Sequence, residues 1–268
     1  MRQFIASLSA GSGQVVPPIG TPIDLYLNEG GQSNMMGQGA GPPSNANLAA
    51  PITGALIYDP DTLSYDTLQY NVNNWSYRPQ EARLGPMLSQ VWNWINNGNG
   101  NVVIEKPAEG GTGIDPALAA DESWAPIHTG SPGALIDRFR ASQTRIAARI
   151  VADAKTNPKY VLVWIQGEKD AKASQANYKL WFEQMLADVE AIKTFDLVVM
   201  CTVNTNSKQF GAGVKAAQLQ WVSENSSRAV SLDLDQFTLG PDTLHYEEDQ
   251  YELIGAAITP LIEGFFNI

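Results

Sequence analysis

The sequence predicts an α/β fold, a three-layer α/β/α sandwich built on a mainly parallel sheet. Short, unbroken apolar runs alternate along the chain with longer amphipathic segments, a pattern typical of parallel strands that helices cover on both faces. In addition, 44% of the 268 residues are hydrophobic and 17% are charged, so the chain has enough apolar material for a large core. No internal repeat or composition break divides it.

The elements are expected in a regular order. A segment rich in Ser, Gly and Pro predicts a flexible leader over residues 1–22, followed by a single domain over residues 23–268. Strands are predicted from apolar runs at 23–27, 53–58, 101–105, 160–165, 197–203 and 229–234. Helices are predicted from helical apolar spacing at 86–96, 131–154, 174–193, 214–225 and 247–266. The stretches 28–51 and 61–79 are expected to be irregular.

Local signals support the helix boundaries. Gly85 and Pro86 open the first predicted helix, and Asn97 and Gly98 follow it. Pro132 suits the first turn of the next helix, because proline lacks the N–H that a first turn leaves unpaired.

Composition and charge exclude several classes of function. The formal net charge is −11 and no cluster of Lys and Arg is present, which disfavours nucleic acid as a partner. No run approaches 18 apolar residues, so no membrane span is expected. Residues 1–9 lack the sustained apolar run of a signal peptide. The single cysteine, Cys201, leaves no intrachain disulfide and no cysteine-based zinc site. We expect no bound metal and no cofactor.

A serine follows the first predicted strand. Ser33 lies in Gly31-Gln32-Ser33-Asn34-Met35-Met36-Gly37, where small neighbours would let its hydroxyl project from the end of the sheet. Active groups of parallel α/β sheets gather at this end. Ser33 is therefore a candidate nucleophile, although a Ser/Asn cap of the next helix explains the same pattern equally well.

A serine nucleophile needs a base, and the chain has two histidines. His245 follows Asp242 by three residues, a spacing that lets the carboxylate hold one ring nitrogen and leaves the other for the serine. His128 has no acid close in sequence. The alternative for Asp242 and His245 is a capped turn before the last helix.

Polar residues also follow the strand at 160–165. Gln166 could donate an amide N–H to a developing oxyanion, and Glu168 could orient neighbouring groups or touch substrate. The alternative is an exposed loop with a helix cap. Glu168 and Asp170 together also raise glycoside hydrolysis, which uses two carboxylates, as a weaker interpretation.

The aromatic residues divide by position. Four tryptophans fall in predicted helices or strands and are expected in the core: Trp92, Trp94, Trp164 and Trp181. Trp75, Tyr77 and Trp124 fall in loops and are candidates for stacking on a substrate. Cys201 lies in an apolar run and is expected to be buried and inert.

Together, four ordered blocks resemble the SGNH (GDSL-like) hydrolase superfamily, in particular its sialate O-acetylesterase-like branch with the acetylxylan esterases of carbohydrate esterase family 6. The blocks are Gly31 to Gly37, Gly110-Gly111-Thr112-x-Ile114, Trp164-Ile165-Gln166-Gly167-Glu168-x-Asp170 and Asp242-x-x-His245. The resemblance runs from about residue 23 to the C-terminus. It departs from the branch at Lys169, where Ser is common, and at Ile165, where an aromatic residue is frequent.

The resemblance implies a flavodoxin-like SGNH hydrolase fold with a five-stranded parallel sheet. It implies Ser33 as nucleophile, His245 as base and Asp242 as its orienter. The implied oxyanion hole consists of Ser33, Gly111 and Gln166, with Gly85 as a second candidate for the glycine. Gln32, Asn34 and Glu168 are expected to bind substrate or to support these groups.

The function that the resemblance implies is serine-dependent removal of acetyl groups from a decorated carbohydrate, through a Ser-His-Asp triad and an acyl-enzyme, without a cofactor. One alternative is a thioesterase or lipase-like SGNH hydrolase that acts on a longer acyl chain. Another is a glycan-binding module of a larger surface or phage-tail assembly.

Overall fold

The computed structural model describes residues 23–38, 41–74 and 84–268, so the predicted leader lies outside the described residues. The strands are β1 (Leu25–Gly31), β2 (Ala55–Asp59), β3 (Ser64–Thr67), β4 (Val102–Glu105), β5 (Lys159–Ile165), β6 (Leu197–Thr202) and β7 (Ala229–Asp233). The α-helices are α1 (Ser33–Met36), α2 (Met87–Asn96), α3 (Leu135–Asp153), α4 (Gln175–Glu190), α5 (Ala212–Glu224) and α6 (Glu248–Phe266). Short 3-10 turns are η1 (Ala46–Ala49), η2 (Pro126–His128) and η3 (Leu234–Gln236).

The strands form one sheet in the order β3-β2-β4-β1-β5-β6-β7. Every neighbouring pair is parallel except β2 with β3, which is antiparallel. The α/β class is confirmed, but the implied number of five strands is wrong, because β2 and β3 add two strands beside β4. The predicted strand at 53–58 corresponds to β2. The stretch 61–79 was expected to be irregular and contains β3.

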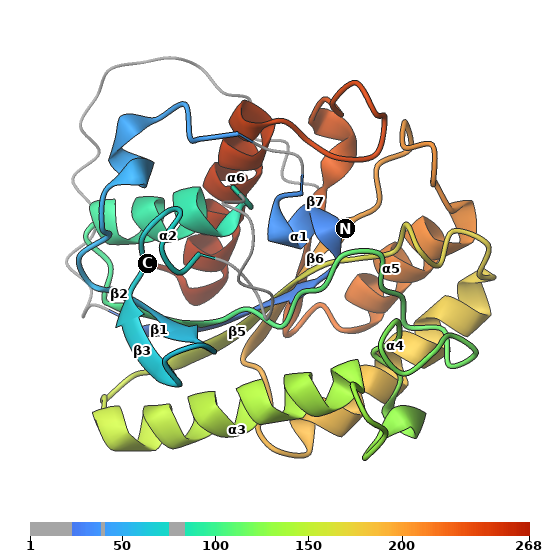
Figure 1. The fold of residues 1–268 in the computed structure, drawn as a ribbon, viewed down its shortest axis with the longest axis horizontal. Helices are drawn as coiled ribbons and strands as arrows, with labels where there is room; N and C mark the ends of the chain where they lie inside the picture. The colour runs from blue at the N-terminus through green and yellow to red at the C-terminus, as the bar shows by residue number, and fades with distance from the viewer. Residues whose placement is uncertain (1–22, 39–40, 75–83) are drawn as a thin grey trace.

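Helices cover the sheet on both faces (Figure 1). One apolar cluster joins Leu25 and Leu27 of β1 to α2 and α6, and a second joins Tyr26 of the same strand to α3, α4 and α5. Successive side chains of a strand point to opposite faces, so one strand supplies both clusters. This double burial is why the parallel strands appear in the sequence as continuous apolar runs.

The end of β1 shows how the backbone turns into the short helix that carries Ser33. Gly31 pairs with Ile165 of β5 and has a φ of +136°, and a methyl group placed on it would lie 2.0 Å from the Ile165 carbonyl oxygen. The N–H of Gln32 donates to that same carbonyl at 3.0 Å. Only glycine fits this close approach, which fixes the start of α1 against β5.

The two largest differences from the predicted boundaries are four residues each. The predicted helix at 131–154 begins at Leu135, because Gly133 has a φ of +78° that no helix accommodates. Pro132 therefore lies in a turn before the helix. The first strand continues to Gly31, beyond the predicted end at residue 27, because residues 28–31 pair with β5.

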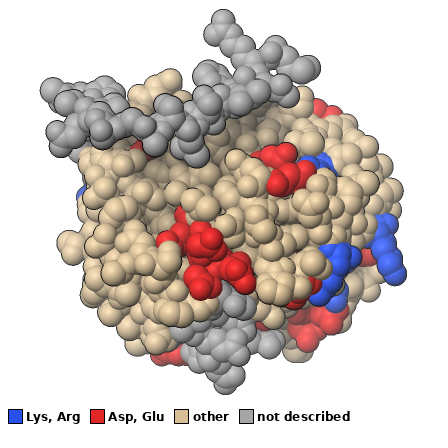
Figure 2. All heavy atoms as spheres, turned by 90° about the horizontal axis from the view of Figure 1, so that it is seen from above, with Lys and Arg blue, Asp and Glu red and all other residues tan. Residues whose placement is uncertain are grey.

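Figure 2 shows the face seen from above the view of Figure 1. Acidic side chains form small separate groups there, and most of the visible Lys and Arg lie toward one edge. Among the described residues drawn, no continuous basic surface crosses this face. No helix in the described part of the chain is both long enough and apolar enough to span a membrane.

Candidate active site

Ser33, His245 and Asp242 lie in one hydrogen-bonded row. Ser33 is the first residue of α1, at the carboxyl end of β1, and its Oγ lies 3.0 Å from Nε2 of His245. The other ring nitrogen, Nδ1, lies 2.6 Å from Oδ2 of Asp242. Ser33 and His245 are 212 residues apart in sequence, and the parallel order of the strands brings them to the same edge of the sheet.

The Asp-x-x-His segment folds back on itself. Oδ1 of Asp242 accepts the backbone N–H groups of Leu244 at 2.8 Å and His245 at 2.9 Å, while Thr243 has a φ of +55°. One carboxylate oxygen therefore closes the turn and the other holds the imidazole. Asp242 thus both caps the turn and orients His245, so the two interpretations of Asp-x-x-His hold together.

Asp242 stays ionised in this arrangement. Partial burial acts to raise the pKa of Asp242, but hydrogen bonds from the backbone of His245 and Leu244 and from the imidazole outweigh it and lower the pKa to about 2. The carboxylate thus remains charged through the neutral range, where it favours an imidazole that carries its proton on Nδ1.

The residues expected in the oxyanion hole differ in their surroundings. No described residue accepts a hydrogen bond from the backbone N–H of Ser33, which lies at the start of α1. A methyl group placed on Gly110 would lie 3.8 Å from Cβ of Ser33, so the loop after β4 passes beside the serine. Gly111, the next residue, is exposed with a φ of +74°. Gly85 packs on the opposite part of α1, where a methyl group would lie 2.4 Å from the Met35 carbonyl oxygen.

Gln166 is buried and bonded at both ends of its amide. Nε2 donates to Oδ2 of Asp170 at 2.6 Å and has longer contacts, of 3.3 and 3.4 Å, with the Thr112 carbonyl and Oε1 of Gln32. Oε1 of Gln166 accepts the hydroxyl of Tyr178 at 2.9 Å. Gln166 makes no hydrogen bond to Ser33 in the described part of the chain, and its amide group is oriented by Asp170 and Tyr178.

Asn34 links three parts of the site. Its Nδ2 donates to Oε1 of Glu168 at 2.7 Å and to the Leu244 carbonyl at 3.1 Å, and its Oδ1 accepts the Tyr251 hydroxyl at 3.0 Å. Asn34 therefore ties the serine helix to the loop after β5, to the loop that carries His245 and to α6. Tyr251 was not singled out from the sequence, because a tyrosine on an amphipathic helix has the pattern of an ordinary core residue.

Glu168, the acceptor of the Asn34 amide, is buried. It is 4% exposed, and burial raises its pKa above the ordinary value, against the hydrogen bond from Asn34. Asp170, its partner in the glycoside-hydrolase interpretation, accepts hydrogen bonds from the protein on both of its oxygens. That interpretation therefore lacks a pair of carboxylates that both face substrate.

Other candidates lie away from Ser33. His128 is in η2, which packs against α3 and α4. Trp124 was expected to stack on substrate and is instead fully buried, with its Nε1 donating to Thr112 Oγ1 at 2.9 Å and its ring edge against Phe139. The stacking prediction for Trp124 is wrong, because its loop folds inward onto α3. Trp75 and Tyr77 lie outside the described residues.

Cys201 lies in β6 and is 1% exposed, and burial raises the pKa of its thiol. Of the four tryptophans expected in the core, Trp94 and Trp164 are buried and Trp92 and Trp181 are partly buried against it. Within the described ranges, no group of three or more His, Cys, Asp and Glu side chains is arranged to hold a metal ion.

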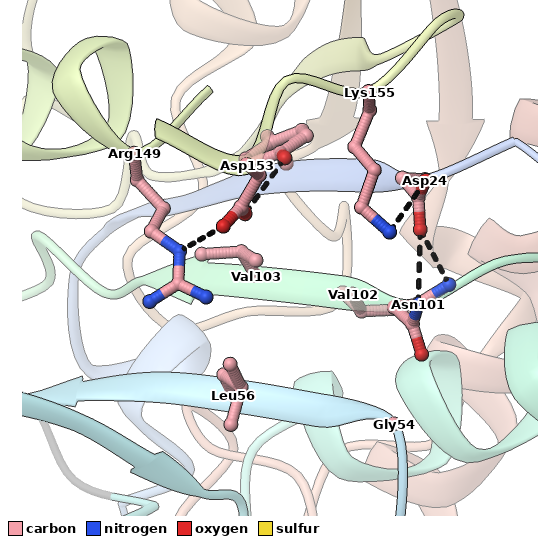
Figure 3. Close-up of a pocket in the computed structure, with 10 residues that line it drawn as sticks. Asp24, Gly54, Leu56, Asn101, Val102, Val103, Arg149, Asp153 and Lys155 are labelled. Carbon is pink, nitrogen blue, oxygen red and sulfur yellow. Dashed lines mark hydrogen bonds and ion pairs between the residues drawn. The ribbon is translucent and has the colours of Figure 1, made fainter. Parts of the chain in front are cut away.

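A cavity of about 310 Å³ lies at the opposite edge of the sheet (Figure 3). It is lined by Asp24, Gly54, Asn101 and Val102, which stand at the amino ends of β1, β2 and β4. This cavity is therefore separated from Ser33 by the length of the strands.

Comparison with known proteins supports an esterase. The model of the family of carbohydrate esterases described as sialic acid-specific acetylesterases matches residues 22–260. The fold is similar to that of NanS, with 16% identity, a TM-score of 0.65, and 93% of this chain and 99% of that chain covered. No curated protein matches this sequence.

Two further solved structures have the same fold. An Arabidopsis thaliana protein is 16% identical, with a TM-score of 0.63 and coverage of 90% of this chain and 98% of that one. The carbohydrate acetylesterase XAC1771 of Xanthomonas citri is 11% identical, with a TM-score of 0.57 and coverage of 90% and 56%. Because the family model spans most of the chain, the resemblance seen in the four sequence blocks is confirmed. The chain belongs to the carbohydrate esterase family of sialic acid-specific acetylesterases, within the SGNH-type hydrolases, and is a carboxylic ester hydrolase.

Proposed function

We propose that the protein removes O-linked acetyl groups from a carbohydrate through a Ser33-His245-Asp242 triad and an acyl-enzyme. The observation that carries the proposal is the position of His245, with Nε2 at 3.0 Å from Ser33 Oγ and Nδ1 at 2.6 Å from Asp242 Oδ2. Membership of a family of carbohydrate esterases supports an acetylated saccharide as substrate, with O-acetylated sialic acid as the first compound to test.

The first half of the reaction forms the acyl-enzyme. Ser33 Oγ attacks the acetyl carbonyl carbon while its proton passes to Nε2 of His245, and the Asp242 carboxylate stabilises the imidazolium. The bond between the carbonyl carbon and the sugar oxygen then breaks, and His245 gives its proton to that oxygen. The sugar leaves with a free hydroxyl, and the acetyl group remains bound to Ser33 Oγ as an ester.

The second half restores the serine. A water molecule attacks the acetyl carbonyl while its proton passes to His245, and the proton then returns to Ser33 Oγ as acetate departs. The negative charge on the carbonyl oxygen in both halves needs N–H donors. The unpaired N–H of Ser33, an N–H from the loop at Gly110 and Gly111, and the amide of Gln166 are the donors that we assign to it.

The test is a Ser33→Ala variant. We expect it to fold normally and to lose at least about 10⁴-fold in kcat, because an alanine has no nucleophilic oxygen. The measurement is acetate released from acetylated sialic acid and acetylated xylan, with circular dichroism as the check on folding. Turnover near the wild-type rate in folded Ser33→Ala would contradict the proposed triad.

The acyl group is tested separately, with wild-type protein and p-nitrophenyl esters of increasing chain length. We expect the acetyl ester to be hydrolysed fastest. A steady rise in kcat/KM with chain length would favour the thioesterase or lipase-like alternative.

A further inference from the structure

Asp170 is a buried carboxylate outside the row of Ser33, His245 and Asp242. It is 5% exposed and follows β5, yet its hydrogen bonds reach the loop after β4. Oδ2 accepts the backbone N–H of Ile114 at 2.9 Å and Oδ1 accepts that of Asp115 at 3.2 Å. A single carboxylate thus joins two loops at the catalytic edge of the sheet.

The same carboxylate holds Gln166. Nε2 of Gln166 donates to Oδ2 of Asp170 at 2.6 Å, which is short for an N–H donor. At the other end of the amide, the hydroxyl of Tyr178 donates to Oε1 at 2.9 Å. A carboxylate only accepts, so the amide nitrogen faces Asp170 and the amide oxygen accepts the hydroxyl of Tyr178.

The second N–H of Gln166 is not committed to a strong hydrogen bond. Its acceptors, the Thr112 carbonyl and Gln32 Oε1, lie at 3.3 and 3.4 Å, beyond the usual N–H···O length. An oxyanion that forms near Ser33 would compete well for this N–H, because charged acceptors make stronger hydrogen bonds than neutral ones.

Close packing makes the loop after β4 depend on Asp170. A methyl group placed on Gly113 would lie 2.5 Å from Oδ1 of Asp170, so the backbone passes directly against the carboxylate. Three residues earlier, Gly110 passes beside Cβ of Ser33. A shift of the loop at Gly113 is therefore transmitted to the backbone next to the serine.

The geometry points to Asp170 as a positioning residue that holds the loop of Gly110 to Gly113 and the amide of Gln166 in the arrangement that stabilises the oxyanion. The inference rests on the proposed esterase mechanism. Asp170 touches neither substrate nor Ser33 in this role. It acts through the two groups that it binds, because small displacements of groups that meet the reacting atoms reduce rates strongly.

Asp170→Asn is the direct test. Asparagine keeps the shape of the side chain but replaces one acceptor by a donor, which faces either Gln166 Nε2 or a backbone N–H. We expect kcat to fall about 100-fold with KM changed less than about 3-fold, equally for p-nitrophenyl acetate and an acetylated sugar, since the oxyanion is common to both. Inhibition by phenylboronic acid, which forms a tetrahedral adduct with serine, should weaken in parallel with kcat.

Glu190→Gln is the matched control. Glu190 also accepts a backbone N–H, that of Phe195 at 3.1 Å, and pairs with Arg228, but it lies at the far end of α4. We expect Glu190→Gln to lower the melting temperature and to leave kcat and boronic acid inhibition unchanged. An equal loss of kcat in both variants would mean that stability alone is involved and would overturn the inference.

Gly113→Ala provides a second route if Asp170→Asn does not fold. It keeps the carboxylate and pushes the loop away from it, and we expect a fall in kcat with little change in KM. Full kcat in folded Asp170→Asn, or in folded Gly113→Ala, would overturn the inference while leaving the triad intact. Activity in Ser33→Ala would instead contradict the triad itself, so the two failures are distinct.

Discussion

The two edges of the sheet use charged and polar groups in different ways. At the amino edge, in the cavity of Figure 3, Lys155 lies 3.3 Å from Asp24 and Arg149 lies 2.8 Å from Asp153. Both pairs are partly exposed, and the second joins residues one turn apart in α3. At the carboxyl edge, Ser33, His245 and Asp242 form a row that ends in a hydroxyl, and Asn34 and Asp170 hold the loops around it. The amino edge therefore has a cavity lined by ion pairs, whereas the carboxyl edge has the hydrogen-bonded groups that an esterase needs.

The comparison predicts that substitutions at the carboxyl edge change catalysis and that those at the amino edge change stability slightly. The largest difference is expected between alanine variants of the two histidines. His245→Ala should reduce kcat by about 10³- to 10⁴-fold, because among the described residues His245 is the base that contacts Ser33 Oγ. His128→Ala should retain the wild-type kcat. The measurement is hydrolysis of p-nitrophenyl acetate by both folded variants, and the opposite ranking would assign the base to His128.

A substitution of Gln166 tests whether this residue stabilises the transition state or binds the sugar. Gln166→Ala should lower kcat by about 10²- to 10³-fold with little change in KM, for p-nitrophenyl acetate as well as for an acetylated sugar, because an oxyanion donor acts on both. Steady-state kinetics on the two substrates provide the check. If the loss occurred only with the sugar, Gln166 would belong to the substrate site.

The lowered pKa of Asp242 predicts that its contribution to the free energy of unfolding decreases in acid. Its pKa is lowered from 3.8 to about 2, so its contribution is fully present above the unfolded value and is lost as the pH falls through the folded value. Because the side chain is 46% exposed, solvent screening reduces this contribution to about 1 kcal/mol. Urea denaturation between pH 5 and pH 2 should show this fall in wild type and a smaller one in Asp242→Asn. Identical pH profiles would mean that the turn does not stabilise the charge.

The smallest effect is expected at the amino edge. Lys155→Gln removes one ion pair in which the lysine side chain is 37% exposed, and such pairs contribute at most about 1 kcal/mol. The free energy of unfolding should change by less than about 1 kcal/mol, and kcat should not change. A large loss of kcat in this variant would contradict the prediction that only the carboxyl edge takes part in catalysis.

The sequence was informative where a residue's role depends on its neighbours along the chain. Parallel strands such as β5 are buried on both faces and appear as apolar runs, and Asp242 closes a turn onto a histidine three residues away. β3 was missed, because its four residues, Ser64–Thr67, are mostly exposed and contain no apolar run. A strand of this kind is stabilised by its pairing with β2, which local sequence does not encode.

Roles that depend on tertiary contacts were harder to predict. Trp124 lies in a loop that packs inward, so a position between predicted elements did not mean exposure. Asp170 appeared in sequence as one of two nearby carboxylates, and its contacts with Ile114 and Asp115 are made across 56 and 55 residues, respectively. The sequence predicted Gln166 as an oxyanion donor, and the neighbours that orient its amide became visible only in the fold.

The contacts of Asn34 have a consequence for how activity appears as the chain folds. This one side chain joins residues 134, 210 and 217 positions away in sequence, and the partner Tyr251 lies in the last helix. Contacts between such distant residues form slowly, because a long segment must first be ordered. Hydrolytic activity should therefore return later than helical circular dichroism during refolding, and a nascent chain gains the ability to cleave esters only after its C-terminal helix has docked.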